Sequence, residues 1–340
     1  MPAVTVRLGA ATASPLIPTP PLRPRERRTP PPADARSAPE SSSAPATPLP
    51  DPDCHSRRGR RPTTPSVPLL SSNPHYHICA AASEERVEIT NKHGERLVGL
   101  LHNTGSNKIV VLCHGFIATK SDSLILDLAS ALTKKGVSVF RFDFSGNGES
   151  EGQFEYGNYR KEADDLYSVV LCLYEKNYDV TAVVGHSKGG DVVVLYASIY
   201  GNVRTIVNLS GRFDLKKGIE ERIGEGSIDR INKEDYLDIK DKFENFNYKV
   251  TKESLMERLN TDMRAASVSI SKECRTARIL CSLSDMFAIS FQVPNEDAYE
   301  FAKLIPNHKL HVIEGANHNY TAHRKEVADA VVDFIMSNGV

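Results

Sequence analysis

The segment Thr181–Gly190 constrains the fold of this chain more than any other part of the sequence. It reads TAVVGHSKGG, so a short apolar run leads into the pattern G-x-S-x-G, and the run DVVVLYASIYG follows. We therefore predict a buried strand, a sharp turn and a helix, with Ser187 at the apex of the turn. Small residues are needed beside the serine because the backbone there is strained and the strand and helix pack closely.

The position of Ser187 suits a role in catalysis. Ser187 directly precedes the predicted helix, and the free N–H groups at a helix N-terminus favour developing negative charge. We interpret Ser187 as a nucleophile. The alternative for the same five residues is a glycine-rich strand–helix connection without a chemical role.

Strand and helix patterns alternate along most of the chain after Glu85. Apolar runs predict strands at 86–90, 96–102, 108–113, 137–142, 182–184, 204–209, 277–283 and 309–313. Helical patterns occur near 124–132, 158–176, 191–201, 296–304 and 326–336. This alternation predicts an α/β fold with a mostly parallel central sheet and helices on both of its faces.

Residues 211–274 interrupt this alternation. The stretch is mostly charged, and we predict that it forms charged helices with one short extended piece, FNYKV. We expect a small helical lid over about residues 211–274, inserted between two strands of the core.

The N-terminal residues differ in composition from the rest of the chain. Residues 1–70 contain 17 of the 20 prolines, ten arginines, five acidic residues and no lysine. Such a segment cannot bury enough apolar surface to offset its ordering entropy, so we predict a disordered extension over 1–80 and a folded domain over 81–340. An arginine- and serine-rich, lysine-free extension also predicts a transit peptide and a chloroplast location. A plain linker in a cytoplasmic protein is the alternative.

Composition excludes several other classes of function. The formal net charge is −1, and no aromatic residues are interleaved among the N-terminal arginines, so we expect no nucleic-acid partner. No apolar run approaches the ~20 residues of a membrane-spanning helix, so we expect no membrane span. The six cysteines form no C-x-x-C pair or metal-ligand cluster, and we expect neither a metal nor a cofactor.

The base that would activate the serine is expected on a late loop. Ligands of parallel sheets bind at the carboxyl ends of the strands, where Ser187, His114 and the loop at Asn317 and His318 all lie. Of the eleven histidines, only His318 directly follows a late predicted strand and precedes the last helix. A serine hydroxyl is a poor nucleophile until a base takes its proton, and we predict that His318 is that base.

Acyl transfer also needs donors for the oxyanion. The backbone N–H of Lys188, the residue after the nucleophile, is one expected donor. The second is expected from the loop after the strand at 108–113, and we assign it to Phe116. His114 is expected to be a structural hydrogen-bonding residue rather than a base.

The acid of the triad is the least defined member. In the chain order Ser–acid–His, the acid follows the strand at 277–283, which places Asp285 there. The residues around Asp285 lack the glycine and polar turn residues expected of such a loop. Asp214, after the strand at 204–209, is the second choice. Asp297 is a third, for which capping of a helix is the simpler explanation.

Several motifs of this chain occur together in one known superfamily. They are HGF at 114–116, RFDFSGNGESEG at 141–152, GHSKGG at 185–190, SGRFDLKKGIEER at 210–222 and VPNEDAYEFAKLIPNHKLHVIEGANHNY at 293–320. From about Glu85 onward the chain resembles the alpha/beta-hydrolase superfamily, most closely a plant branch of lidded serine hydrolases similar to bacterial cinnamoyl/feruloyl esterases and serine aminopeptidase-like hydrolases. The resemblance implies the alpha/beta-hydrolase fold, with Ser187 as nucleophile and His318 as base. It also implies that the Phe116 and Lys188 amides are the oxyanion donors.

The stretch Thr276–Gln292 departs from the superfamily pattern. Members usually carry a strand that ends in His-Gly-Ser-x-Asp and is soon followed by Val-Pro, whereas this stretch lacks the motif and is several residues too long. We hypothesise that it is read-through of an unspliced intron, or a divergent splice form, that replaced the acid loop. Sequencing the transcript between the codons for Arg275 and Val293 tests this, and uniform retention in mature message would contradict it.

The sequence therefore predicts a metal-independent serine hydrolase that cleaves carboxylic esters of small molecules through an acyl-serine intermediate. Thioester or peptide hydrolysis by the same residues is one alternative. A catalytically impaired protein that keeps the fold and binds a small molecule is another, and the departure at the acid loop favours it.

Overall fold

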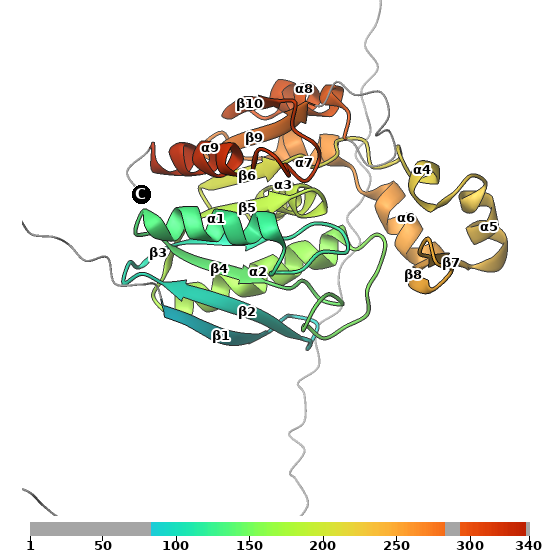
Figure 1. Ribbon diagram of the computed structural model, residues 1–340, viewed down its shortest axis with the longest axis horizontal. Helices are drawn as coiled ribbons and strands as arrows, with labels where there is room; N and C mark the ends of the chain where they lie inside the picture. Colours follow the sequence, from blue (N-terminus) through green and yellow to red (C-terminus); the bar gives the residue numbers. More distant parts are fainter. Residues whose placement is uncertain (1–82, 283–292, 338–340) are drawn as a thin grey trace, which may run out of the picture. The chain divides into compact units, whose positions relative to one another are not determined.

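The structure, a computed structural model, describes residues 83–282 and 293–337 (Figure 1). Within them, strands β1-β2-β4-β3-β5-β6-β9-β10 form one sheet in that order. Their bounds are β1 Ser83–Thr90, β2 Arg96–Asn103, β3 Lys108–Cys113, β4 Ser138–Phe142, β5 Asp179–His186, β6 Thr205–Leu209, β9 Arg275–Ser282 and β10 His308–Glu314. The β1–β2 and β2–β4 pairs are antiparallel and the other pairs are parallel, so the predicted mostly parallel sheet is confirmed.

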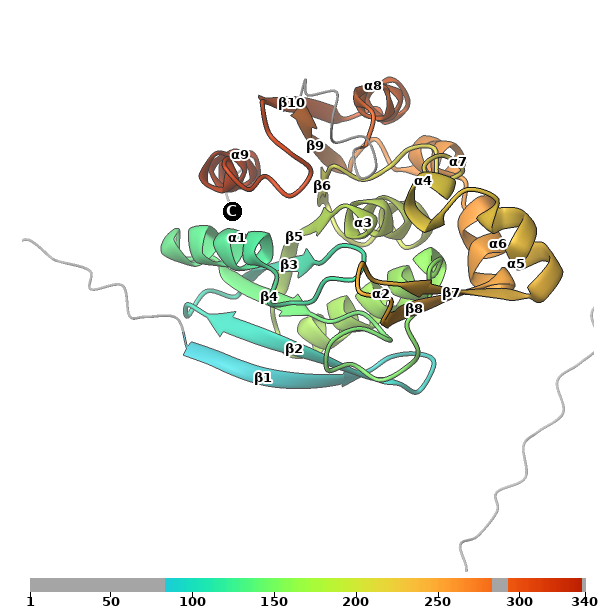
Figure 2. The ribbon, with the colours of Figure 1, turned by 45° about the vertical axis from the view of Figure 1, so that its right-hand side comes forward.

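Helices cover both faces of the sheet, as predicted (Figure 2). Side chains alternate between the faces of a strand, and in β3 Ile109 and Val111 belong to one apolar cluster whereas Val110 and Leu112 belong to another. The first cluster includes residues of helices α2 Tyr159–Glu175, α3 Lys188–Ile199, α7 Met263–Ser269 and α8 Asn295–Leu304. The second includes residues of α1 Ser123–Lys134 and α9 Arg324–Met336.

The segment between β6 and β9 contains a smaller, separate layer. It comprises α4 Glu220–Ile223, α5 Ser227–Glu234, β7 Tyr236–Lys240, β8 Phe246–Thr251 and α6 Lys252–Asn260. Helix α7 follows and packs against the main sheet. Figure 1 shows α5, α6 and the β7–β8 hairpin standing away from the main sheet. They share an apolar cluster that includes Ile231, Leu237, Val250 and Leu255, and Tyr156 of the main domain also belongs to it. We refer to α4 through α6 as the lid segment.

One prediction for this segment is wrong. Tyr236–Lys240 was expected to be part of a charged helix, but it is strand β7, which pairs with β8 in an antiparallel hairpin. Leu237 is buried and Ile239 is partly buried, whereas their neighbours Tyr236 and Asp238 are exposed. A period of two in burial is that of a strand with one covered face, and cross-strand packing outweighed the high local charge.

The sheet order places a crevice at the ends of β3 and β5. Strand β3 lies between β4 and β5. Helix α1, which follows β3, packs on one face of the sheet, whereas α3, which follows β5, packs on the opposite face. Parallel sheets bind ligands at such a switch point, beyond the carboxyl ends of the strands. The loops that follow β3 and β5 hold Phe116 and Ser187.

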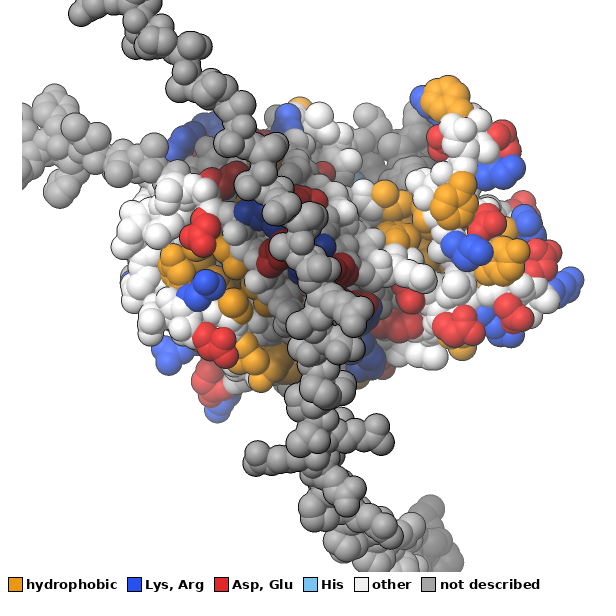
Figure 3. Space-filling model, turned by 90° about the horizontal axis from the view of Figure 1, so that it is seen from below, with side chains coloured by type: hydrophobic (Ala, Val, Ile, Leu, Met, Phe, Trp, Pro, Cys, Tyr) orange, Lys and Arg blue, Asp and Glu red, His pale blue; other side chains and the backbone are white. Residues whose placement is uncertain are grey.

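Residues 1–82, with the predicted extension and its targeting signal, and residues 283–292, with Asp285, lie outside the described residues. None of the helices in the described part has the length and apolar character that crossing a bilayer requires. On the face shown in Figure 3, acidic and basic side chains are intermixed, and neither sign forms a continuous area.

Candidate active site

The turn between β5 and α3 holds Ser187 in a strained backbone conformation. Its φ is 53° and its ψ is −119°, and Ser187 immediately precedes the first helical residue of α3. The Ser187 N–H donates to the carbonyl of Leu209 at 2.8 Å, and the Gly190 N–H donates to the Ser187 carbonyl at 2.8 Å. A non-glycine residue at positive φ persists only where its surroundings fix it, and such residues concentrate at functional sites.

The glycines on either side of Ser187 are required by close packing. A Cβ on Gly185 would lie 2.0 Å from the Gly189 carbonyl oxygen. A Cβ on Gly189 would lie 2.5 Å from the carbonyl oxygen of His114, at the end of β3. The G-x-S-x-G spacing is therefore needed for β5, α3 and β3 to approach one another at this point.

His318 lies beside the serine hydroxyl. It is in the loop between β10 and α9, and its Nε2 is 2.8 Å from Ser187 Oγ. Burial, with smaller contributions from His186 and nearby arginines, lowers the pKa of His318 to about 3. The ring is therefore neutral near pH 7, the form that can accept a proton from the serine.

Two other histidines support the site without touching the hydroxyl. His186 Nε2 donates to the backbone carbonyl of His318 at 2.9 Å, which ties the loop after β10 to the end of β5. His114 is buried, with Nδ1 2.8 Å from the Gly115 carbonyl and Nε2 accepting from the Phe144 N–H at 3.1 Å. Both ring nitrogens are thus used, and the structural role expected for His114 is confirmed.

The two predicted oxyanion donors border the same space as the reacting pair. A small cavity is lined by Phe116, Lys188, Ser187 and His318 among others. Phe116 follows β3, and Lys188 is the first residue of α3. Both residues therefore border the space next to the Ser187 hydroxyl.

The side chain of Lys188 turns inward from the turn. Its Nζ is 2.7 Å from Glu162 Oε1 on α2, and both side chains are at least nine-tenths buried. The ammonium also lies 5.3 Å from the centre of the Tyr159 ring. Burial raises the pKa of Glu162 to about 7, although Lys188 opposes the shift. This charge is therefore engaged by α2 rather than directed at a ligand.

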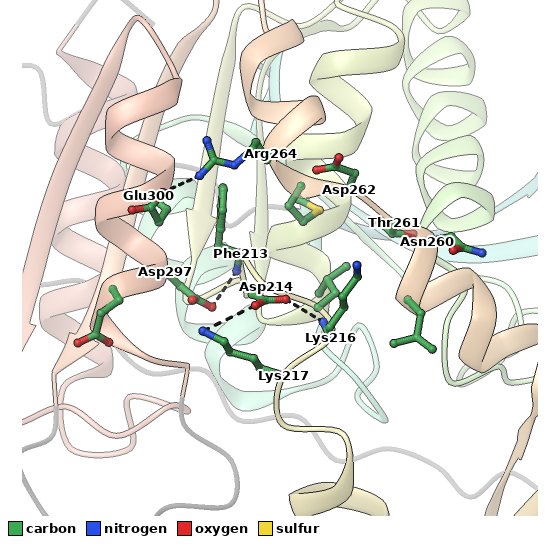
Figure 4. Close-up of a pocket in the computed structure, with 14 residues that line it drawn as sticks. Phe213, Asp214, Lys216, Lys217, Asn260, Thr261, Asp262, Arg264, Asp297 and Glu300 are labelled. Atoms are coloured by element: carbon green, nitrogen blue, oxygen red, sulfur yellow. Dashed lines mark hydrogen bonds and ion pairs between the residues drawn. The ribbon is translucent and has the colours of Figure 1, made fainter. Parts of the chain in front are cut away.

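The described residues contain no acid partner for His318. Its Nδ1 is buried and has no hydrogen-bond partner within the described part of the chain. Asp214 accepts from the Lys216 N–H at 3.1 Å and pairs with Lys217 at 3.7 Å (Figure 4). Asp285, the first choice, lies outside the described residues.

Asp297 has a role that sequence reasoning missed. It is buried at the start of α8, and its Oδ2 accepts from the Phe213 N–H at 2.9 Å (Figure 4). The carboxylate thus secures the loop that follows β6, in place of the helix cap expected for it.

The lid segment forms one wall of a cavity of about 490 Å³ that reaches Ser187. Ile239, Asn247 and Tyr248 of the β7–β8 hairpin line it together with Phe116 and Arg222. The Phe116 ring packs edge-on against Tyr248, with centroids 5.5 Å apart, and the Arg222 guanidinium lies 4.8 Å from the centre of the Phe116 ring.

Sequence reasoning assigned none of these lid residues to the site. No periodicity marks them, and their sequence separation from Ser187 varies widely. Only the fold of the lid segment brings them to the serine.

Comparison with known proteins agrees with this geometry. Residues 104–230 match the family model described as serine aminopeptidase, S33. A comparison with curated protein sequences gives no match. Among solved structures, Est1E from Butyrivibrio proteoclasticus with bound ferulic acid has a TM-score of 0.60 at 23% identity, covering 74% of this chain and 98% of Est1E.

Two further structures are similar to a comparable degree. The Pyrococcus furiosus esterase Pf2001 has a TM-score of 0.57 at 22% identity, covering 75% of this chain and 93% of that protein. The alpha/beta hydrolase GrgF from Penicillium sp. sh18 has a TM-score of 0.62 at 17% identity, covering 75% and 98%. Together with the sheet order, these likenesses show that the chain has the alpha/beta-hydrolase fold, as predicted.

Proposed function

We propose that this chain is a serine hydrolase that cleaves carboxylic esters of small molecules through an acyl-serine intermediate. The observation that carries the proposal is the 2.8 Å approach of His318 Nε2 to Ser187 Oγ at a turn where φ of the serine is 53°. The structural similarity to the Pyrococcus furiosus esterase Pf2001 supports the choice of an ester.

The reaction follows from the positions of these groups. Ser187 Oγ attacks the ester carbonyl carbon while His318 Nε2 takes the hydroxyl proton, and the amides of Phe116 and Lys188 stabilise the oxyanion. The C–O bond to the alcohol then breaks, and the alcohol leaves with the proton from His318. Water, deprotonated by the same nitrogen, attacks the acyl-serine and releases the acid.

Asp285 is proposed as the acid that orients His318. The unpartnered Nδ1 of His318 supports the need for such a group, because a histidine base is normally held by a third residue. Asp214 is the second choice, although in the structure its carboxylate is engaged by Lys216 and Lys217.

Hydrolysis of p-nitrophenyl acetate and butyrate by the full chain tests the proposal. We expect turnover by the wild type and a loss of about three orders of magnitude or more in Ser187→Ala. Covalent labelling by a fluorophosphonate, lost in Ser187→Ala, reports the activated serine separately from substrate choice. A folded wild type that neither turns over these esters nor labels would contradict the proposal.

The second candidate function is a small-molecule binder with an impaired site. The unpartnered His318 Nδ1 is the observation that favours it. Such a protein would bind ligands in the 490 Å³ cavity without labelling of Ser187. If Ser187 is labelled and the chain hydrolyses thioesters or peptides but not esters, it is instead a thioesterase or a peptidase.

We also propose that the chain belongs to the plant branch of these hydrolases and is imported into chloroplasts through its N-terminal extension. The extension is rich in arginine and serine and its first 70 residues contain no lysine, which supports this targeting. A fusion of residues 1–80 to a fluorescent protein, observed in plant cells, tests it. Fluorescence that stays in the cytosol would favour the alternative location.

A further inference from the structure

The loop after β3, which carries the oxyanion donor Phe116, has a strained backbone. Ile117 has a φ of 52°, and its side chain is 48% exposed. Positive φ is an outlier for a β-branched residue and persists only where surrounding contacts hold it. The loop also lies directly against the nucleophile, because a Cβ on Gly115 would be 3.2 Å from Ser187 Cβ. Since the Ile117 side chain is exposed, the contacts that hold this loop come from its neighbours.

The ring of Phe116 is packed by side chains of two different parts of the molecule. Phe154 and Tyr156, in the loop between β4 and α2, lie edge-on to it with centroids 5.4 and 5.6 Å away. From the lid segment, Tyr248 of β8 lies edge-on at 5.5 Å, and the Arg222 guanidinium lies 4.8 Å from the ring centre. Edge-on aromatic pairs are favourable beyond the area that they bury. The lid segment therefore helps to hold the loop after β3.

Tyr248 connects the lid segment to both of these loops. Besides Phe116 it contacts Phe154, with ring centroids 5.5 Å apart and the rings edge-on. Tyr248 is buried and belongs to the apolar cluster of the lid segment, against which Phe116 and Phe154 pack. Its direction is set by the hairpin, where it is paired in register with Ile239 of β7.

We propose that Tyr248 is a positioning residue for the oxyanion site: its ring, packed on that of Phe116, holds the strained loop so that the Phe116 N–H is aligned with the oxyanion. The inference rests on the proposed function, in which this amide is a donor. An oxyanion donor is effective only when it is aligned before the reaction, and loss of one donor costs about 10²- to 10³-fold in kcat. The lid segment thus completes the catalytic geometry as well as enclosing the substrate.

Tyr248→Leu in the full chain tests this role. Leucine keeps an apolar side chain at the buried position but removes the ring. A misaligned donor weakens binding of the transition state alone, so we expect kcat and kcat/KM to fall by the same factor, about 10- to 100-fold. The factor should be the same for p-nitrophenyl acetate and butyrate, because the oxyanion is common to both.

A trifluoromethyl ketone gives a second readout that does not depend on turnover. Its carbonyl carbon bonds to Ser187 Oγ while His318 takes the hydroxyl proton, which leaves an oxyanion where the transition state has one. The inhibition constant in Tyr248→Leu should therefore rise by about the factor that kcat/KM falls.

Two variants control for structural effects. Tyr248→Phe keeps the ring and should retain kcat/KM within about twofold of wild type. Tyr236→Leu removes an exposed tyrosine from β7 of the same hairpin and should do the same. The Tm of each protein shows that it is folded.

Ile117→Gly tests the link to backbone strain. Glycine adopts positive φ without a steric penalty, so the loop should keep its course with less support from the Phe116 ring. In the Ile117→Gly background, Tyr248→Leu should therefore lower kcat/KM by a factor at least about threefold smaller than in wild type.

The outcomes separate this inference from the proposed function. If wild type hydrolyses the esters but Tyr248→Leu changes KM alone, or affects butyrate alone, Tyr248 is only a wall of the 490 Å³ cavity and the inference is wrong. A Tyr248→Phe protein as slow as Tyr248→Leu, or an equal loss in the Ile117→Gly background, would also overturn it. If wild type neither turns over esters nor is labelled by a fluorophosphonate, the proposed function itself fails.

Discussion

The turn after β5 and the strand β9 lie two strands apart in the same sheet, yet they differ in how well their polar groups are satisfied. At the turn, the Ser187 N–H, the Ser187 carbonyl and the Ser187 hydroxyl each have a partner. On β9, Arg278 is completely buried, and its Nε and one terminal nitrogen have no partner within the described residues.

The neighbouring strand does not supply what Arg278 lacks. Arg278 is paired in register with Asn208 of β6, whose Nδ2 is also buried without a partner in the described part of the chain. The remaining guanidinium nitrogen donates to the Gly211 carbonyl at 2.5 Å. The turn at Ser187 is therefore fixed by steric fit and hydrogen bonds, whereas β9, the strand that leads to the expected acid, carries a buried guanidinium whose hydrogen bonds are incomplete within the described residues. Mutations at the turn and on β9 should therefore have different effects on activity and stability.

The largest effect is expected from Asp285→Asn. This variant tests whether the acid expected after β9 contributes to catalysis. If Asp285 orients His318, the amide would hold the imidazole in the wrong tautomer, and kcat/KM for p-nitrophenyl butyrate should fall about 10³- to 10⁴-fold. Asp214→Asn is the matched control and should stay within a few-fold of wild type. Equal activity of wild type and Asp285→Asn would assign the acid elsewhere.

A large loss of stability is expected from Gly185→Ala, which tests the steric fit of the turn. The added Cβ would lie 2.0 Å from the Gly189 carbonyl oxygen, so β5 and α3 must separate. We expect a loss of about 3 kcal/mol or more in the free energy of unfolding, measured by denaturant titration. Gly105→Ala is the control, since its Cβ meets nothing within 4 Å and only its φ of 87° is unfavourable, at about 1 kcal/mol. Equal losses in the two variants would refute the steric argument.

The same contrast explains what the sequence could predict. The turn at Ser187 and the position of His318 depend on local patterns: a glycine spacing, an apolar strand and a loop before the last helix. These patterns leave few alternatives, and the structure brings the two side chains to 2.8 Å. Most strand and helix positions followed from periodicity for the same reason.

Features that depend on contacts between distant segments could not be predicted. Strand β7 is charged in sequence, and only its pairing with β8 makes it a strand. Arg222 and Arg258 reach the site from the lid segment, at sequence separations with no periodic signal. The helix cap expected of Asp297 is instead a contact with the loop after β6, since its partner lies 84 residues earlier.

A smaller and opposite effect is expected from Arg278→Met, which removes from β9 the buried guanidinium with incomplete hydrogen bonds within the described residues. Methionine keeps much of the length of the side chain and needs no hydrogen bonds. Replacement of a buried charge that lacks a full set of partners by an apolar residue is often neutral or stabilising, and we expect a gain of about 1–2 kcal/mol in the free energy of unfolding. A loss of more than about 2 kcal/mol would mean that Arg278 is satisfied in solution, for example by buried water.

A pH-dependent effect is expected at His308, at the start of β10 and next to β9 in the sheet. Burial, with a smaller contribution from the Arg278 charge, lowers the pKa of His308 from its ordinary value of 6.5 to about 4. The unfolded chain therefore binds a proton at His308 near pH 6.5 that the folded chain resists until about pH 4, so this residue costs stability as pH falls through that range. Compared with wild type, His308→Gln should lose about 2 kcal/mol less between about pH 7 and pH 4.5. In the Arg278→Met background the difference should shrink, because one cause of the lowered pKa is gone. If the difference made by His308→Gln is unchanged in that background, burial alone lowers the pKa of His308, and the charge of Arg278 has no effect on it.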